Sequence, residues 1–211
     1  MNSESQLRPS GAIRAVIEPQ QSCLEAFQEI CRTTTAQILQ YWAVVRVSDD
    51  REGPHQMRVG VRRFRAALRL FRPVATGPDL RKLDRRARDL ARCVGVLRDA
   101  DVLATDIVGG VGRDYPRAVG MRALQSVLSS DCDEKRQKVR EQLAKRSSLS
   151  LQRDLASIPD NLQHLIRAED AKQLSRPIGS ISGELLRRRW RKVASYGKRI
   201  DNLEDAERHE M

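Results

Sequence analysis

The sequence predicts an all-α protein built from antiparallel helical bundles. Apolar residues recur every three or four positions in several long segments, as in helices that bury one face. No segment has the pattern of a β-strand, and the connections between the predicted helices are short, which favours antiparallel neighbours. At 211 residues, the chain can form one large domain or two small ones with a core that needs neither metal nor disulfide.

The first half of the chain predicts three helices. Residues 1–16 contain Ser, Pro and Gly without a clear period, so we expect a flexible N-terminal segment. A helix follows and ends at the polar stretch 48–54; its apolar stripe comprises Leu24, Phe27, Cys31, Thr34, Ile38, Tyr41 and Val45. A second helix is expected over 54–71 and a third over 79–103, whose buried face comprises Leu83, Ala87, Leu90, Val94 and Leu97.

The second half is less regular. Three glycines predict a loop, namely Gly109, Gly110 and Gly112. We expect a charged helix over 115–146, a short helix over 149–165, a linker through Pro177 and a last long helix over 178–200.

The charge of the chain predicts a polyanionic partner. Lys and Arg number 39 against 28 Asp and Glu, a formal net charge of +11. Most of the excess is arginine, whose planar fork grips phosphate oxygens in pairs. Only 4% of the residues are aromatic, which disfavours the stacking platforms of proteins that bind single-stranded nucleic acid.

The sequence also predicts a cytoplasmic protein. No N-terminal basic region leads into an apolar run, and no segment is long and apolar enough to suggest a membrane span. The four cysteines are widely separated and lack the spacing of metal ligands: Cys23, Cys31, Cys93 and Cys132. We therefore expect reduced thiols, no metal site and no cofactor.

The segment 54–72 is the strongest candidate for a binding site, because it contains six arginines, one histidine and no acid. Five of these residues are spaced three, four, three and four apart, so they form one stripe on a helix: His55, Arg58, Arg62, Arg65 and Arg69. One apolar flank predicts a core face: Met57, Val61, Phe64, Leu68 and Phe71. The other flank comprises Val59, Ala66 and Leu70.

Helix stability does not explain this stripe, because like charges at such spacing cost about 0.2–0.5 kcal/mol per pair. We favour a ligand as the explanation over an ordinary solvated face, which would be broader. If neighbouring helices cover the apolar flanks, the arginines line a channel with a concentrated positive potential that fits a phosphate chain.

Two further basic stripes remain open to two interpretations. The third helix carries Arg81, Arg85, Arg88 and Arg92, and the last carries Arg187, Arg191 and Lys198. Such stripes are either solvated surface or further ligand contacts, and we include Arg88, Arg92, Arg187, Arg191 and Lys198 among the candidate binding residues. Near the end of the third helix, Arg98, Asp99 and Asp101 suggest ion pairs that orient other arginines rather than a metal or acid–base site.

Two motifs of this sequence resemble the CHAD domain, a histidine-containing α-helical domain. The first is His55-Gln-Met-Arg-Val-Gly-Val-Arg-Arg-Phe-Arg-Ala-Ala-Leu-Arg69, and the second is Gly95-Val-Leu-Arg-Asp-Ala-Asp-Val102. The resemblance implies two pseudo-symmetric helical bundles around a basic pore, with inorganic polyphosphate as the ligand. It also implies phosphate-facing roles for the five stripe residues, whereas Arg63 matches the motif but points elsewhere on the helical wheel.

The resemblance is looser over 185–193, and His209 looks like the start of a second histidine motif. The second basic helix of the family pattern is expected beyond that point, so the second half looks incomplete. Either the chain is a fragment of a longer protein, or a homodimer completes the bundle. We accordingly divide the chain into the N-terminal segment 1–16, a first helical half over 17–108 with the basic motif, and a C-terminally incomplete second half over 109–211.

The leading functional hypothesis is non-enzymatic binding of polyphosphate. As the resemblance implies, its partners would be polyphosphate granules or polyphosphate-metabolising enzymes; we expect no membrane partner, because the arginine bias suits phosphate better than a membrane surface. The alternative is sequence-independent binding to the phosphate backbone of nucleic acids. Phosphotransfer or phosphate hydrolysis needs carboxylates for Mg²⁺ and ideally a glycine-rich phosphate loop, and neither is visible in the sequence. A scaffold role for a helical partner also remains open.

Overall fold

The computed structural model describes residues 14–115 and 118–197. Within these ranges the chain is helical and contains no β-strand, apart from an isolated antiparallel bridge between Ser22 and Pro177. The elements are α1 (Cys23–Val47), α2 (Glu52–Phe71), α3 (Pro78–Val102), a π-helical turn (Leu103–Val108), α4 (Gly109–Asp114), α5 (Met121–Ala144), α6 (Arg146–Asn161), 3₁₀ turns at Leu162–Leu165 and Ala168–Asp170, α7 (Ala171–Leu174) and α8 (Ile178–Gly197). The predicted all-α class is confirmed.

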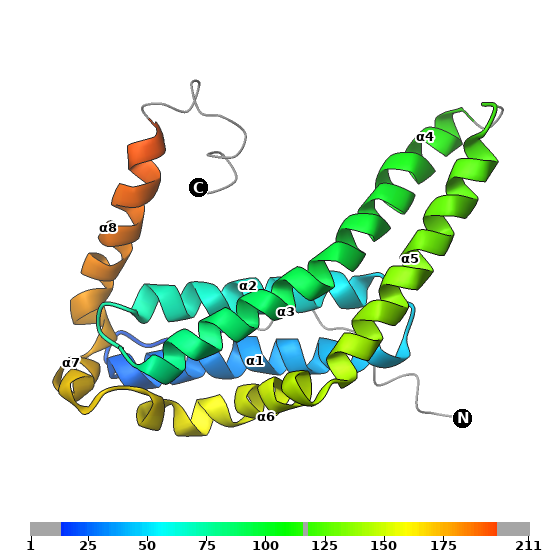
Figure 1. The fold of residues 1–211 in the computed structure, drawn as a ribbon. Coiled ribbons are helices and arrows are strands. Elements are labelled where there is room, and N and C mark those ends of the chain that lie inside the picture. Colours follow the sequence, from blue (N-terminus) through cyan, green and yellow to red (C-terminus); the bar gives the residue numbers. More distant parts are fainter. Residues whose placement is uncertain (1–13, 116–117, 198–211) are drawn as a thin grey trace.

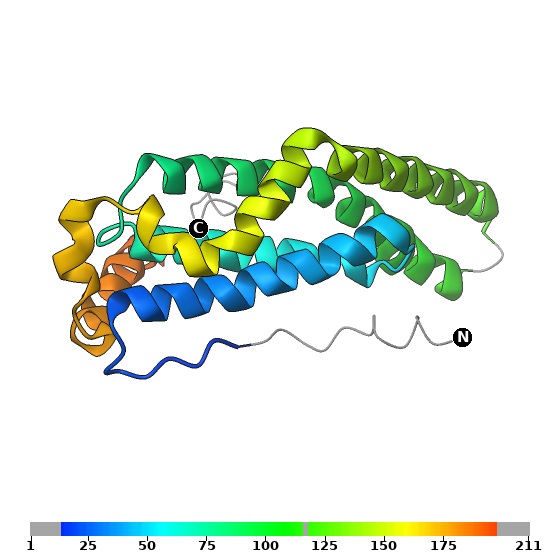
Figure 2. The same ribbon diagram turned by 90° about the horizontal axis from the view of Figure 1, so that it is seen from below.

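The helices form a body with two arms. In Figure 1, α1, α2, α3 and α6 lie along one another, and the contacts between α1 and α2, α2 and α3, and α1 and α6 agree with this arrangement. The end of α3, α4 and α5 form an arm at one end of the body, and α8 forms an arm at the other end (Figure 1). Figure 2 views the body from below and shows α1 and α6 on that side of it. The two arms therefore flank the surface on which α2 and α3 lie.

Local sequence explains where α1 begins and why it is buried. Ser22 and Glu25 form a capping box, in which the hydroxyl of Ser22 accepts from the amide of Glu25 and the carboxylate of Glu25 accepts from the amide of Ser22. The hydroxyls of Thr33 and Thr34 donate to backbone carbonyls one turn earlier, so these buried side chains need no partner outside the helix. As a result, α1 can pack against several neighbours.

The core face predicted for the basic helix is buried as expected. Met57, Val61, Phe64, Leu68 and Phe71 are each at most 8% exposed. Phe71 stacks on Phe27 of α1 with a centroid distance of 4.3 Å. This packing fixes the rotation of α2, which decides where its charged residues point.

The loop predicted at the three glycines is wrong. Gly109, Gly110 and Gly112 lie within α4, which follows the π-helical turn without a break. A glycine inside a helix costs only about 1 kcal/mol relative to alanine, so tertiary packing can retain it. The chain reverses later, before α5, where Gly120 has φ +82°, the only positive φ of a glycine within the described ranges. The boundary proposed between 108 and 109 stays a prediction.

A buried ion pair joins α3 to α5. Arg136 donates to Oδ1 of Asp101 at 3.1 Å, and Asp101 is fully buried. Burial raises the pKa of the Asp101 carboxyl even though Arg136 opposes this effect. Because removing one partner leaves an uncompensated buried charge, the pair fixes the base of the arm in one arrangement.

All four cysteines are free thiols, as predicted. Burial raises the pKa of Cys23 to about 11 and that of Cys31 to about 12, so these thiols stay protonated at neutral pH. Within the described parts of the chain, no helix has the length and apolar character needed to cross a membrane.

Candidate functional site

The stripe predicted on α2 lines one groove. His55, Arg58, Arg62, Arg65 and Arg69 all border a cavity of about 460 Å³, together with Val59 of the same helix. The other wall comes from the C-terminal half of α3 and includes Ala91, Arg98, Asp99 and Val102. We call this cavity the α2–α3 groove.

Two glycines, one from each of the two sequence motifs at 55–69 and 95–102, allow the groove to form. A Cβ atom on Gly60 would lie 3.0 Å from Cγ1 of Ile38, so glycine permits the close approach of α2 to α1. A Cβ atom on Gly95 would lie 3.1 Å from Nη1 of Arg58, so glycine at this position leaves room for the guanidinium. Both glycines therefore have a steric role in placing the basic stripe.

Carboxylates of α3 orient two of the stripe arginines. Arg58 donates to the carbonyl of Gly95 at 3.2 Å and to Oδ1 of Asp99 at 2.9 Å. Arg65 donates through Nε to Oδ1 of Asp84 at 2.7 Å. Asp99 accepts from Arg58, and Asp101 accepts from Arg136 of α5. The prediction that these two acids form ion pairs is therefore confirmed. Each pair leaves other N–H groups of its arginine available to a ligand.

Arg62 and Arg69 differ from these two. Both are exposed, and neither side chain has an ion-pair or hydrogen-bond partner among the described residues. Their charges add to those of Arg58, Arg65 and Arg98 in one groove, whose low-dielectric walls focus the positive potential.

Arg63 points away from the groove, as predicted. Its guanidinium donates to Oε1 of Gln37 on α1 at 3.1 Å. Consequently this arginine belongs to the α1–α2 contact rather than to the groove.

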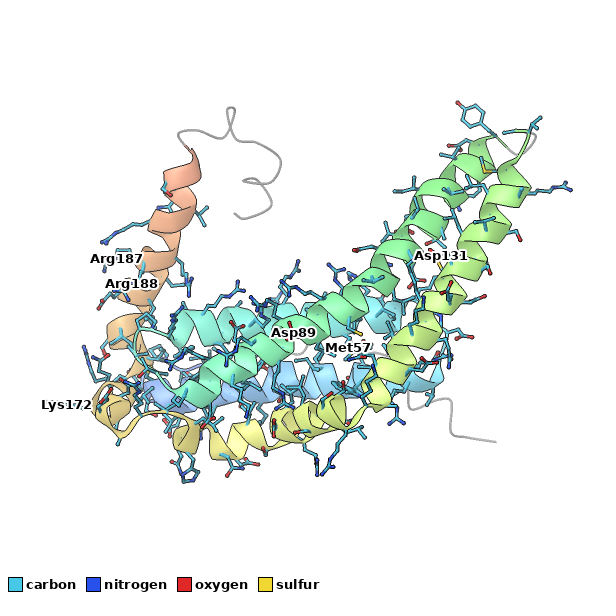
Figure 3. All side chains as sticks on the ribbon, viewed as in Figure 1. Met57, Asp89, Asp131, Lys172, Arg187 and Arg188 are labelled. Carbon is cyan, nitrogen blue, oxygen red and sulfur yellow. The ribbon has the colours of Figure 1, made fainter. Side chains whose placement is uncertain are left out.

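The other predicted binding residues lie elsewhere. Arg88 and Arg92 are exposed on α3 and do not line the groove, and Arg92 lies 3.6 Å from Asp89. Arg187 and Arg191 are exposed on α8, and Figure 3 shows Arg187 on that arm, beyond the end of α2. Lys198 and His209 lie outside the described residues.

Sequence reasoning did not include two arginines in the site. Arg98 lines the groove and lies 3.7 Å from Asp106; it was interpreted only as part of an ion-pair cluster. Arg189 donates from α8 to the backbone carbonyl of Arg69. Its neighbours on the helix, Arg187 and Arg191, were chosen instead, because spacing on α8 alone does not show which face meets α2.

Comparisons with known proteins agree with this fold. A search of curated proteins found no match. Among solved structures, the chain is similar to the crystal structure of the CHAD domain from the plant Ricinus communis, with 26% identity and a TM-score of 0.70. That likeness covers 94% of this chain, which spans 62% of the length of the plant chain. The sequence model described as the CHAD domain matches residues 29–211, so the protein belongs to the CHAD domain family.

Proposed function

We propose that the chain binds inorganic polyphosphate along the α2–α3 groove. The observation that carries this proposal is the gathering of all five stripe residues in a single cavity with Arg98. Membership of the CHAD domain family, which is known for polyphosphate binding, supports the same ligand.

The groove suits a linear polyanion rather than a single small anion. His55 and Arg69 are fourteen residues apart on one helix, which corresponds to about 21 Å along its axis. Cations along this length present donors at successive turns, and a polymer with a phosphate at each repeat can contact several of them at once.

The orienting carboxylates support binding as well. Holding Arg58 on Asp99 and Arg65 on Asp84 restricts two long side chains before the ligand arrives. Such preorganisation lowers the entropy cost of binding. Asp99 and Asp84 also reduce the local positive charge, so Arg62 and Arg69, which are unpaired among the described residues, are the cations on which affinity depends most.

The proposal assigns binding, not catalysis, to this groove, because its residues supply positive charge and hydrogen-bond donors. Incubation with tripolyphosphate and Mg²⁺ should release no orthophosphate above the background of a protein-free control. Sustained release would establish an enzyme and overturn this part of the proposal. In cells, a binding role would place the chain on polyphosphate granules or beside enzymes that metabolise the polymer.

Homodimerisation, expected if a second copy completes the bundle, is also part of the proposal. The arm formed by α8 exposes Leu186, Trp190 and Val193, which a second copy would cover. The molar mass measured by light scattering checks this directly: twice 24.0 kDa supports a dimer, and 24.0 kDa at all concentrations excludes it.

The test of the proposed ligand is a calorimetric titration with long-chain polyphosphate and with duplex DNA, at matched phosphate concentration and moderate salt. We expect clearly tighter binding to polyphosphate. Replacing Arg62 and Arg69 together, as Arg62→Ala/Arg69→Ala, should weaken that binding about 100-fold, because each arginine supplies a charge-assisted hydrogen bond of about 1.5 kcal/mol or more.

A matched control separates local binding interactions from net charge. Lys82→Ala/Arg153→Ala removes the same two charges from exposed positions on α3 and α6 and should change the affinity by about twofold or less. Equal affinity for DNA and polyphosphate would favour the nucleic-acid alternative. Equal reductions in affinity in the two double variants would mean that the groove is not the site.

A further inference from the structure

A second basic pocket lies where α2 turns into α3. Its volume is about 240 Å³, and four arginines line it together with Thr76 and Gly77: Arg69, Arg72, Arg81 and Arg85. The sequence does not predict a pocket at this turn for any of these four residues. One of them, Arg69, also lines the α2–α3 groove. We call this cavity the turn pocket.

The charge of the turn pocket is not neutralised by the fold. Among the described residues, no acidic side chain forms an ion pair with Arg69, Arg72, Arg81 or Arg85. Asp84 also lines the pocket, but its carboxylate accepts from Arg65 on the groove side. Asp170 keeps a negative charge close to the turn; its carboxylate accepts from the amide and the hydroxyl of Thr76, and among the described residues it forms no ion pair with an arginine.

A further cation approaches from α8. Arg189 donates to the backbone carbonyl of Arg69, so α8 places its guanidinium against the C-terminal part of α2. Burial is the main cause of a lowered pKa at Arg189, and repulsion from Arg69, Arg72 and Arg188 lowers this pKa further. Positive charges from α2, α3 and α8 therefore converge at one place, and folding alone gains nothing from this.

The start of α3 adds to the positive potential. Gly77 provides no side-chain cap and Pro78 follows it, so no side chain of the N-cap residue satisfies the first amides of this 25-residue helix. The partial positive charge of the helix N-terminus, which the carboxylate of Asp79 in the first turn partly offsets, then adds to the charges of Arg81 and Arg85.

The turn pocket lies next to the groove. Arg69 lines both cavities. From Arg62 in the groove to Arg72, the C-cap residue directly after α2, the helical rise is about 15 Å over ten residues. A short anion such as tripolyphosphate reaches one cavity at a time, whereas a long linear polyphosphate reaches both.

We propose that the turn pocket is a second phosphate subsite, which binds the distal part of a polyphosphate chain lying in the α2–α3 groove and thereby selects long chains over short ones. This inference rests on the proposed function. Joining two subsites through one ligand raises the affinity for long chains without altering either site.

The experiment measures the affinity of the full chain for long-chain polyphosphate and for tripolyphosphate in three variants. Arg81→Ala/Arg85→Ala changes the turn pocket, Arg62→Ala changes the groove, and Lys82→Ala/Arg153→Ala serves as the charge control. Arg81 and Arg85 are exposed, so helicity and Tm should remain those of the unmodified chain.

The affinity for long-chain polyphosphate should fall about tenfold in Arg81→Ala/Arg85→Ala and also in Arg62→Ala, because this ligand uses both cavities. The affinity for tripolyphosphate should fall comparably in only one of these two variants. Unchanged long-chain affinity in Arg81→Ala/Arg85→Ala would overturn the second subsite while leaving the groove intact. Tenfold weaker tripolyphosphate binding in both variants would show one undivided site, and failure of the unmodified chain to bind long polyphosphate would overturn the proposed function itself.

Discussion

The basic stripes of α2 and α8 have similar spacing but different surroundings. On α2, the face behind the stripe is buried against α1, and acids of α3 hold Arg58 and Arg65 in place. On α8, Arg187 donates to the carbonyl of Gly183 within its own helix, and Leu186 and Trp190 beside it are exposed. A basic stripe on one face of a helix therefore gives a groove only where a second helix supplies the opposite wall.

The two helices also differ in how firmly they are held. The buried face of α2 runs from Met57 to Phe71, as Figure 3 illustrates for Met57 inside the bundle. By contrast, the buried residues among the described side chains of α8 lie in its first half: Ile178, Ile181 and Leu185. The position of a charge on α2 is fixed by packing along the helix, whereas the side chains described in the outer turns of α8 are exposed.

The largest expected effect tests whether polyphosphate affinity depends on the groove or only on the spacing of the arginines along a helix. Replacing Arg187 and Arg191 with Ala should weaken polyphosphate binding by about threefold or less, against about 100-fold for Arg62→Ala/Arg69→Ala. Isothermal titration at the same salt concentration checks both. Comparable reductions in affinity would mean that the α8 stripe also binds the ligand and that the comparison drawn above is wrong.

The salt dependence of binding sharpens the same comparison. Removing one arginine that neutralises a phosphate should reduce the slope of log affinity against log salt by about 0.7, the value for a single-stranded polyanion. Arg62→Ala/Arg69→Ala should therefore flatten the slope by about 1.4, twice that value, while Arg187→Ala/Arg191→Ala should leave it nearly unchanged. Titrations at several salt concentrations measure this slope. An identical slope in the unmodified chain and in both double variants would contradict the assignment of the binding site to the α2–α3 groove.

A glycine in the buried helix should be intolerant of added volume. Gly60→Val places atoms against Ile38, where a Cβ atom alone already approaches within 3.0 Å. Such overpacking costs about 1–3 kcal/mol in the free energy of unfolding. Chemical denaturation measures this, and a variant as stable as the unmodified chain would show that α1 and α2 can separate freely.

A glycine in α8 should respond in the opposite direction. At Gly183 a Cβ atom would meet only the flexible end of Arg187, at 3.4 Å. Gly183→Ala should therefore stabilise the protein by about 0.5–1 kcal/mol, because alanine is the better helix former. If the same denaturation experiment shows a decrease in stability, α8 is more tightly packed than its exposure indicates.

The smallest expected effect concerns Arg58. Gly95→Ala should shift the guanidinium of Arg58 slightly, because the added methyl would lie 3.1 Å from its Nη1. We expect the affinity for polyphosphate to fall about two- to threefold. Far-UV circular dichroism should confirm unchanged helicity. An affinity equal to that of the unmodified chain would indicate that Arg58 does not need its present position.

The periodicity of the sequence was sufficient to predict the helices of the body and the stripe on α2. Both depend on which residues share one face of a single helix, and spacing determines this. The apolar residues around Met57 are buried and the five cations share one groove, as that reasoning requires.

The sequence does not predict features that depend on how two helices lie relative to each other. Arg98 lines the groove because of the way α3 crosses α2, and Arg189 reaches Arg69 because of the direction of α8. Neither direction follows from spacing along one helix. At residues 109–112, intrinsic preference favoured a loop, but the helix continues from the π-helical turn, which contacts both α4 and α5.

The bridge between Ser22 and Pro177 has a consequence for the order of folding. The amide of Cys23 donates to the carbonyl of Arg176, and the amide of Ile178 donates to the carbonyl of Gln21, so the start of α8 is fastened to the start of α1. These hydrogen bonds join residues far apart in the sequence, whereas α1, α2 and α3 pair with their immediate neighbours. Because closing a long loop is entropically costly, the groove should assemble before α8 docks. A ribosome-bound nascent chain can accordingly complete its groove first and bring Arg189 to Arg69 only afterwards.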